Sequence, residues 1–347
     1  MSADLTDRPV LVTAVGGAPG FDLARMLQHR GYQVIGTDAN AYAAGLLLPG
    51  LTPRLIPHSS DAQYTSALLE ICRTLRPAAL IPTDEGEILR LAEISDHLDV
   101  LGVRTWLPTP AAMTACHDKA EFHQRARQHG VPTPATWLPD ELDRIPDGLD
   151  LVVKPRRGHG AKNVQFCRTV RQARVLCELV DDPIVQERIT GSEFTADCLI
   201  DRAGTVSVIP RWRLAVRNGL AIAAATFHDD QVAQTVTTTL AALGMTSLCC
   251  VQGFVSDGDG PARVVITEVN GRIAGAFPVS VAAGADLIGQ FLGGLFGRPV
   301  DHDRLRFTPG IHLIKYVDTI AAGPAPLAAV RPIPAPVPVT DLVGGPR

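Results

Sequence analysis

Glutamate, asparagine and arginine occupy every second position at the end of an apolar stretch in the second half of the chain. The stretch runs from Val264 to Arg272, and its polar residues are Glu268, Asn270 and Arg272. Because side chains on a strand alternate between faces, a strand here would present the three together. A carboxylate and an amide oxygen suit a hard cation such as Mg2+, and an adjacent guanidinium suits phosphate oxygens. A half-buried strand with a polar outer face explains the isolated pattern at least as well.

A lysine before a glycine loop is a second candidate for phosphate chemistry. Lys154 lies near the end of an apolar run, and Gly158, His159 and Gly160 follow it. Glycines let backbone N–H groups approach a ligand, and nearby basic side chains add positive charge. The stretch does not have the Walker spacing, and an ordinary basic hairpin is an equally good interpretation.

Two further groups of charged residues lie between these stretches. Glu187 and Glu193 flank a glycine turn between two predicted strands. Arg211, Arg213 and Arg217 follow on a predicted strand and turn, and they share one face if that strand is regular. A guanidinium pairs well with a carboxylate or phosphate, so we interpret the arginines as substrate-binding residues. A solvated edge strand, kept charged to prevent pairing, is the open alternative.

In this order, the stretches resemble the ATP-grasp enzymes, and among them the carbamoyl-phosphate-synthetase-like ligases. The resemblance covers roughly Val10 to Gly297 and is carried by five motifs after an N-terminal α/β segment. The motifs are Asp118-Lys119, Val153-Lys154-Pro155, Gly158-His159-Gly160, the run from Glu187 to Glu193, and Glu268-Val269-Asn270-Gly271-Arg272.

The resemblance implies a nucleotide site for ATP. Lys119 and Lys154 would hold the α and β phosphates, the glycine loop would cover the triphosphate, Glu187 would meet the adenine amino group, and Glu193 would bind the ribose. The residues so implied are Lys119, Lys154, Gly158, His159, Gly160, Gln186, Glu187, Ile189 and Glu193.

The resemblance also implies a metal site and catalytic residues. Glu268 and Asn270 would coordinate Mg2+ or Mn2+, with Gln252 as the candidate third ligand at a position where many family members carry a carboxylate. Arg272 would steady the transferred phosphoryl group, and Lys154 would act with it in catalysis.

The implied activity is that of an ATP- and Mg2+-dependent ligase. It would activate a carboxylate as an acyl phosphate and join it to an amine or similar nucleophile, releasing ADP and phosphate. The chain shows no convincing Ser-His-Asp or Cys-His arrangement, and this reaction needs no protein nucleophile.

Two alternatives stay open. One is a nicotinamide-dependent oxidoreductase that uses the turn from Gly16 to Gly20 and Asp38, although its G-G-x-x-G spacing is not the usual fingerprint. The other is an ATP-binding module without turnover.

Composition favours small-molecule partners. The 36 acidic and 32 basic residues are mixed along the chain and give a net charge of −4, so no basic patch for nucleic acid is evident. The N-terminus does not resemble a signal peptide, and no apolar run reaches membrane-spanning length. We therefore expect a cytoplasmic protein that binds a carboxylate and an amine, has no nucleic-acid or membrane partner, and could form a homodimer.

Alternating strand and helix patterns from Pro9 to Pro82 predict a parallel sheet. The fold class is thus α/β, with α+β character in the nucleotide-binding part: an ATP-grasp fold after a Rossmann-like domain. The expected divisions are a pre-ATP-grasp α/β domain at 1–108, a small ATP-grasp subdomain with linking helices at 109–190, a C-terminal subdomain with the metal site at 191–320, and a Pro/Ala-rich tail at 321–347.

Overall fold

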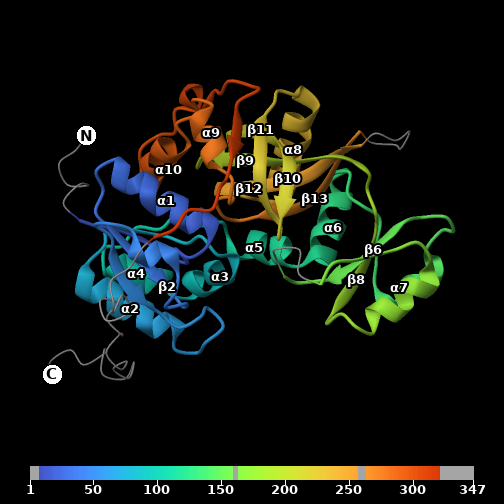
Figure 1. Cartoon of the computed structure of the whole chain (residues 1–347), viewed down its shortest axis with the longest axis horizontal. Coiled ribbons are helices and arrows are strands. Elements are labelled where there is room, and N and C mark those ends of the chain that lie inside the picture. The colour runs from blue at the N-terminus through green and yellow to red at the C-terminus, as the bar shows by residue number, and fades with distance from the viewer. Residues whose placement is uncertain (1–7, 159–162, 257–262, 321–347) are drawn as a thin grey trace. The chain divides into compact units, whose positions relative to one another are not determined.

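The computed structural model describes residues 8–158, 163–256 and 263–320 (Figure 1). Their contacts divide them into two units. The first contains residues 8–107 with the short segments 295–297 and 317–320, and the second contains residues 108–294 and 298–316.

The first unit is built on a parallel sheet, which confirms the prediction from strand and helix alternation. Its strands in sheet order are β3 (Thr52–Leu55), β2 (Val34–Asp38), β1 (Val10–Val12) and β4 (Ala79–Ile81). Its helices are α1 (Ala18–His29), α2 (Tyr64–Leu75), α3 (Glu85–Glu93) and α4 (Ser95–Val100), with the 3-10 turn η2 (Ala44–Leu47). The central strand β1 is fully buried, and this explains why its sequence is continuously apolar.

A small antiparallel sheet belongs to the second unit. Its strands in sheet order are β5 (Thr136–Trp137), β8 (Pro183–Glu187), β6 (Leu151–Pro155) and β7 (Gln165–Cys167). The helix α7 (Val170–Cys177) and the 3-10 helix η3 (Pro139–Arg144) pack against it. Leu151 and Val153 of β6 lie in this core, so Lys154 points to the opposite face.

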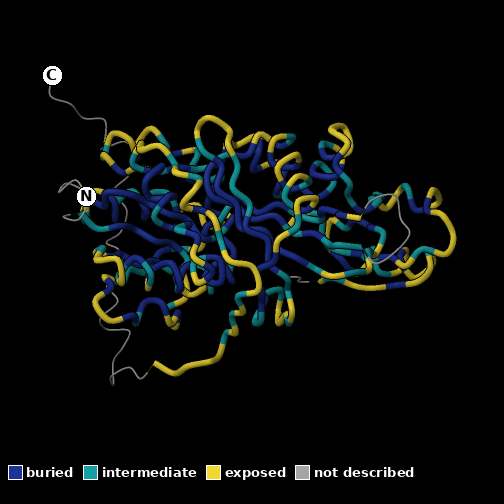
Figure 2. The backbone as a smooth tube through the Cα atoms, turned by 90° about the horizontal axis from the view of Figure 1, so that it is seen from above, coloured by how far each residue is buried: buried dark blue, intermediate teal, exposed yellow. Residues whose placement is uncertain are grey.

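The second unit also contains a larger antiparallel sheet. Its strands in sheet order are β13 (Val264–Asn270), β12 (Ser247–Ser256), β9 (Gly191–Ile200), β10 (Val206–Arg217), β11 (Leu220–Thr226) and β14 (His312–Ile314). The other elements of this region are α5 (Pro110–His117), α6 (Lys119–Gln128), α8 (Asp230–Leu243), α9 (Pro278–Ala282), α10 (Leu287–Leu295) and η4 (His302–Leu305). Buried residues, dark blue in Figure 2, are concentrated in the strands, and exposed residues, yellow, in the connecting loops.

The larger sheet has one apolar and one polar face. Phe194, Ala196 and Cys198 of β9 pack with apolar side chains of α5, α6 and α8. Because side chains alternate along a strand, Thr195 and Asp197 lie on the opposite face. The helices therefore cover the apolar face of β9, and the polar side chains of β9 lie on the opposite face of the sheet.

The strand register extends the polar face across the sheet in rows of paired residues. In one row, Thr195 pairs with Gln252, which pairs with Glu268. In the next row, Asp197 pairs with Cys250, which pairs with Asn270. Directly paired residues share a face, so side chains from β9, β12 and β13 meet there.

The backbone immediately after β13 lies close to α5. A Cβ atom at Gly271 would come 2.1 Å from Sδ of Met113 and 3.3 Å from Cγ of Pro108. A side chain at position 271 would therefore require the flexible end of Met113 to move.

The alternative of a solvated edge strand is wrong for the arginine-bearing strand β10, because it pairs with both β9 and β11. Among the helices of the described residues, none combines the length and apolar character that a membrane span requires.

Candidate functional site

Three predicted site residues from three different elements meet in the second unit. Lys154 of β6 is half-buried, and burial lowers its pKa from 10.5 to about 8. The charge of Glu268 on β13 raises that pKa, whereas the charge of Lys119 lowers it further. The two ammonium groups therefore repel each other, and a polyanion placed between them would relieve the repulsion.

Lys119 begins α6 and is almost fully buried. Its Nζ donates a hydrogen bond to the carbonyl oxygen of Gly158 at 2.8 Å. Gly158 has a φ of +139°, a conformation that favours glycine, and it begins the predicted glycine loop. His159 and Gly160 lie outside the described residues.

Asp118 anchors the start of this loop to the helix. As the N-cap of α6, its carboxylate accepts hydrogen bonds from the backbone N–H groups of Ala120 and Glu121. Arg156 Nε donates to both of its oxygens at 2.7 and 2.8 Å, and Arg157 Nη2 donates at 2.8 Å. Burial alone would raise the pKa of Asp118, but the hydrogen bond and the charges of both arginines lower it below its usual value.

Glu268, Asn270 and Arg272 lie at the end of β13 and just beyond it. Glu268 is half-buried and faces Gln252 on the neighbouring strand. Asn270 is buried, and its Oδ1 accepts a hydrogen bond from Arg272 Nη2 at 3.2 Å. Arg272 Nη1 also donates to the carbonyl oxygen of Ile273 at 3.1 Å. The guanidinium is thus held next to Asn270, one of the proposed metal ligands.

The oxygen atoms that β12 and β13 offer could bind Mg2+ only if substrate phosphates supplied further ligands. Glu268 supplies one carboxylate, while Asn270 and Gln252 supply amide oxygens. The described residues contain no cluster of three His, Cys, Asp or Glu side chains that could hold a metal. Mg2+ commonly binds through one or two carboxylates together with substrate phosphates, so these residues suit a cation that arrives with a nucleotide.

The predicted adenine and ribose residues lie on β8, on β9 and in the segment between them. Gln186 is buried and donates from Nε2 to Thr136 Oγ1 at 2.8 Å. Glu187 and Ile189 are half-buried, and Glu193 forms an ion pair with Arg213 at 3.0 Å. The Glu193 carboxylate is therefore already held in place on the polar face of β9.

The three arginines of β10 do not form one set, contrary to the expectation of a regular strand. Register shifts between Arg213 and Val216 disturb the pairing with β11, and Arg217 is exposed beside the hairpin turn. Arg213 is mostly buried and donates to Thr195 Oγ1 at 3.3 Å. Arg211 is fully buried, so the solvated-surface interpretation is wrong for it.

Arg211 belongs to a buried network that the sequence did not reveal. Its Nε donates to Asp197 Oδ2 at 3.0 Å, and its Nη2 lies 3.4 Å from Asp197 Oδ1. Ser280 of α9 donates from Oγ to the same Asp197 carboxylate at 2.6 Å. Asp197 stands in an apolar run and Ser280 in a stretch of small residues, so neither had the pattern of a site residue.

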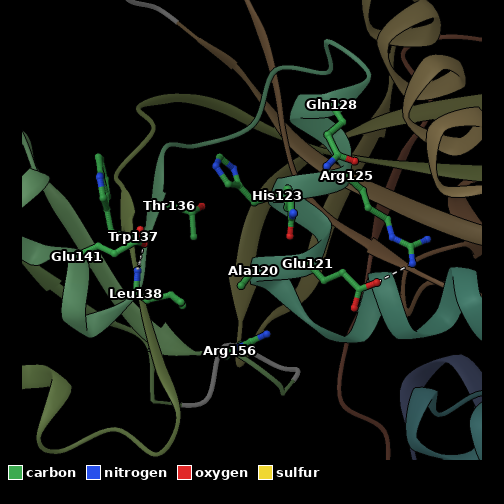
Figure 3. A pocket seen from close by; sticks show the side chains of 11 residues that line it. Ala120, Glu121, His123, Arg125, Gln128, Thr136, Trp137, Leu138, Glu141 and Arg156 are labelled. Atoms are coloured by element: carbon green, nitrogen blue, oxygen red, sulfur yellow. Dashed lines mark hydrogen bonds and ion pairs between the residues drawn. The ribbon is translucent and has the colours of Figure 1, made fainter.

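A separate hollow of about 610 Å3 lies beside α6 and β5 (Figure 3). It is lined by Glu121, His123, Arg125, Trp137 and Arg156, among others. Its charges are paired, since Glu121 binds Arg125 at 2.7 Å and Arg156 binds Asp118. None of the predicted site residues that the structure describes lines this hollow, so we do not assign the chemistry to it.

In the first unit, Asp38 has the contacts of a turn-stabilising residue. Its Oδ2 accepts from the N–H of Gly16 at 2.7 Å, and its Oδ1 accepts from the N–H of Asn40 at 2.8 Å. Deeper in the unit, Glu87 accepts a hydrogen bond from Thr13 Oγ1, and burial raises the pKa of Glu87 to about 7.

Comparison with known proteins matches the part of the chain that contains these residues. Residues 116–276 match the family model of the ATP-grasp domain. A D-alanine–D-alanine ligase of Fusobacterium nucleatum is 28% identical over 116 residues, which are 33% of this chain and 39% of that protein. An N5-carboxyaminoimidazole ribonucleotide synthase of Synechococcus elongatus is 28% identical over 162 residues, 44% of this chain and 38% of that protein. The matches thus span about two fifths of each relative.

Solved structures share the fold over more of the chain. The biotin carboxylase domain of 2-oxoglutarate carboxylase from Hydrogenobacter thermophilus has a TM-score of 0.68 at 15% identity, over 86% of this chain and 72% of that one. An L-amino acid ligase from Bacillus licheniformis has a TM-score of 0.66 at 16% identity, over 87% and 77%. At these identities the likeness shows the fold alone.

Proposed function

Because residues 116–276 match the family model of the ATP-grasp domain, we propose that this chain is an ATP-grasp enzyme, and specifically an ATP- and Mg2+-dependent ligase. It activates a carboxylate as an acyl phosphate and joins the acyl group to an amine or similar nucleophile, releasing ADP and phosphate. The observation that carries the proposal is the approach of Lys119, Lys154 and Glu268 from α6, β6 and β13. Two cations and one carboxylate are the groups that a metal–polyphosphate complex needs.

The nucleotide role rests on electrostatics at the phosphate end. The charge of Lys119 disfavours the charged form of Lys154, and Glu268 offsets this effect; a triphosphate would add negative charge beside both lysines and would replace the Gly158 carbonyl as the partner of Lys119. The adenosine would be held by residues of β8, of β9 and of the segment between them, namely Gln186, Glu187, Ile189 and Glu193. Gln186 is held by Thr136 and Glu193 by Arg213, so these two side chains would lose little conformational freedom when adenosine binds.

Glu268 and Asn270 would hold the Mg2+ that enters with ATP, with Gln252 as a weaker third ligand. When bound, the cation neutralises phosphate charge and orients the γ-phosphate. Lys154 and Arg272 would act at the transferring phosphoryl group, where positive charge stabilises the negative charge that develops. No protein nucleophile is required, because the substrate carboxylate itself attacks the γ-phosphorus.

One relative supports this reaction class, because the D-alanine–D-alanine ligase that this chain resembles is a ligase by name. For this chain we propose a small-molecule carboxylate and an amine as substrates, with anion binding by the arginines of β10. Arg211 and Arg213 lie on the polar face for this role, whereas Arg217 is exposed. A cytoplasmic location and a homodimer stay predictions.

The alternatives have weaker support. A nicotinamide site would need the Asp38 carboxylate for a ribose, but both of its oxygens accept backbone hydrogen bonds. An ATP-binding module without turnover would use the same lysines, so activity must separate it from the ligase.

The test is phosphate release from ATP with a panel of carboxylic acids, each offered with and without amines. We expect release only with the correct acid, and Glu268→Gln should abolish it while the variant keeps its melting temperature. The control is Glu178→Gln, which removes an exposed carboxylate in the same unit. ATP binding without release for any acid would favour the binding module, and normal release by Glu268→Gln would remove Glu268 from the metal site.

A further inference from the structure

Exposed apolar side chains gather where β14 forms the edge of the larger sheet. Val216 on β10 is 44% exposed, and Ile314 and Tyr316, at the end of β14 and just beyond it, are 74% and 81% exposed. Exposed apolar residues are normal when they are scattered singly, whereas a contiguous exposed patch marks an interaction surface. The strand register decides which of the two cases applies.

The register puts Val216 and Ile314 on the same face of the sheet. Val216 pairs with Ala221 of β11, and Ile314 pairs with Ala223 of the same strand. Ala221 and Ala223 are two residues apart and therefore share a face, and directly paired residues share a face as well. The small alanine side chains leave the two larger ones as neighbours.

Tyr316 lies on this face too. The N–H of Lys315 donates to the carbonyl oxygen of Ile222 at 2.7 Å, so the pairing with β11 continues past the end of β14. Tyr316 is two residues from Ile314 and comes opposite Ala221 in this register. The contiguous surface, which we call the edge patch, consists of Val216, Ala221, Ala223, Ile314 and Tyr316.

The strand beside this patch has a free edge. Among the described residues, β14 pairs with β11 alone. Alternate residues of an antiparallel ladder direct their backbone groups to opposite sides, so those of Ile314 and Tyr316 point away from β11, whereas those of Lys315 point to it. Free edges are commonly protected by charged side chains or proline. The side chains at the two outward positions are apolar or aromatic, and Lys315 lies half-buried on the other face.

We propose that β14 pairs with β14 of a second copy of this chain across a two-fold axis, so that the two larger sheets become one continuous sheet. This interface does not depend on the ligase proposed above. A two-fold contact uses the same patch on both subunits, and antiparallel pairing of one edge with itself meets this condition. The unpaired backbone groups of both edges would then satisfy each other.

A second copy fits because the segment is self-complementary. Antiparallel pairing centred on Ile314 places it opposite Ile314 of the copy and places His312 opposite Tyr316 of the copy. Both pairs bring apolar or aromatic side chains together on the face of the edge patch. On the other face, Lys315 meets Leu313 of the copy, so no like charges come together.

The sequence after β14 also favours a longer strand than the ladder contains. Tyr316 and Val317 are residue types that favour strands, although β14 ends at Ile314. Pairing with a second copy would extend the strand to Tyr316.

The size of the contact determines its strength. Stable specific interfaces bury about 800 Å2 on each partner, and smaller ones belong to weak complexes. Pairing of two short edges is in the smaller class, so we expect a dissociation constant on the order of micromolar.

The test is sedimentation velocity of the full chain from about 1 to 200 µM, a range that covers micromolar dissociation constants. We expect a reversible monomer–dimer equilibrium. Ile314→Lys should weaken dimerisation about tenfold or more, because two like charges would meet on the two-fold axis. Leu179→Lys is the matched control, since it places the same charge at a 75% exposed apolar position outside the edge patch, and it should dimerise like the parent chain.

Cysteine cross-linking tests the register. Opposite residues of an antiparallel pair have a Cα separation that a disulfide can span. Ile314→Cys, oxidised with glutathione disulfide, should therefore form a covalent dimer at concentrations where the parent chain dimerises. Lys315→Cys should not, because Leu313 is opposite it. The parent chain, whose cysteines are buried or half-buried, shows the background.

Three results would overturn the interface. One is a parent chain that stays monomeric throughout the concentration range; slow reaction of Ile314→Cys with a maleimide would then assign the patch to another segment of this chain, and fast reaction would leave it uncovered. The second is a dimer that Ile314→Lys does not weaken. The third is a dimer that does not become covalent through Ile314→Cys.

Discussion

Replacement of Asp118 by asparagine tests whether its carboxylate fixes the phosphate-binding end of the site. The Asp118 side chain is 5% exposed and accepts hydrogen bonds from Arg156 and Arg157 as well as from the first turn of α6. Asparagine is as good an N-cap as aspartate, so Asp118→Asn preserves the helix start and removes only the negative charge.

The size of the effect follows from the exposure of the partners. Breaking a buried ion pair costs about 3–5 kcal/mol, and breaking an exposed pair costs about 0–1 kcal/mol. Arg156 is 30% exposed and Arg157 54% exposed, so their charges can be partly solvated after the change. We therefore expect a loss of about 2 kcal/mol, which for a unit of this size corresponds to about 6 °C in melting temperature.

Calorimetric unfolding of the full chain measures the stability change, and hydrogen exchange of the peptides that contain α6 shows where it is located. Titration with ATP should show weaker binding, because Lys119 is adjacent to Asp118 and its Nζ contacts the loop that Asp118 anchors. The control is Asp143→Asn, which breaks the ion pair with Arg174 at 2.9 Å, where the side chains are 89% and 55% exposed. If Asp118→Asn and Asp143→Asn had the same stability and the same ATP affinity, the carboxylate would have no anchoring role.

The remaining predictions concern charge at the site and in the first unit. Lys119→Ala and Lys154→Ala should each weaken ATP binding in calorimetry, with unaltered circular dichroism. If both variants bound ATP with the affinity of the parent chain, these lysines would not belong to a nucleotide site. Glu268→Gln should require more Mg2+ for half-maximal ATP binding, whereas an unaltered Mg2+ dependence would make Glu268 a structural residue. Burial raises the pKa of Glu87 from 4.5 to about 7, so the folded chain holds this proton more tightly than the unfolded chain. Stability should therefore fall by about 3 kcal/mol as the pH rises from 4.5 to 7, and Glu87→Gln should flatten this part of the urea-unfolding profile.

The fold was predictable where local patterns and packing agree. Buried parallel strands are continuously apolar, so β1, β2 and β4 were visible in sequence as runs between glycine turns and helices. The irregular part of β10 was not predictable, because register shifts depend on the pairing with β11.

The motif residues were easier to find than the residues that support them. Lys154 and Glu268 interact electrostatically, as expected for parts of one site, although their catalytic roles stay predictions. Asp197 was missed because a lone acid in an apolar strand has no periodic signal. Its partner Arg211 is 14 residues away and Ser280 is 83 residues away, so only the folded sheet brings the three together.

The contact between Gly271 and Met113 has a consequence for how this sequence can diverge. A Cβ atom at position 271 would meet the sulfur of Met113 in α5, so the flexible end of this methionine would have to move. A smaller residue at 113 would leave space for a side chain at 271 without that movement. Among homologues we therefore expect the sizes of these two positions to be correlated, with alanine at 271 accompanied by alanine or glycine at 113. Two positions that carry no site chemistry would then evolve as a pair, since their side chains would compete for the same space beside the end of β13.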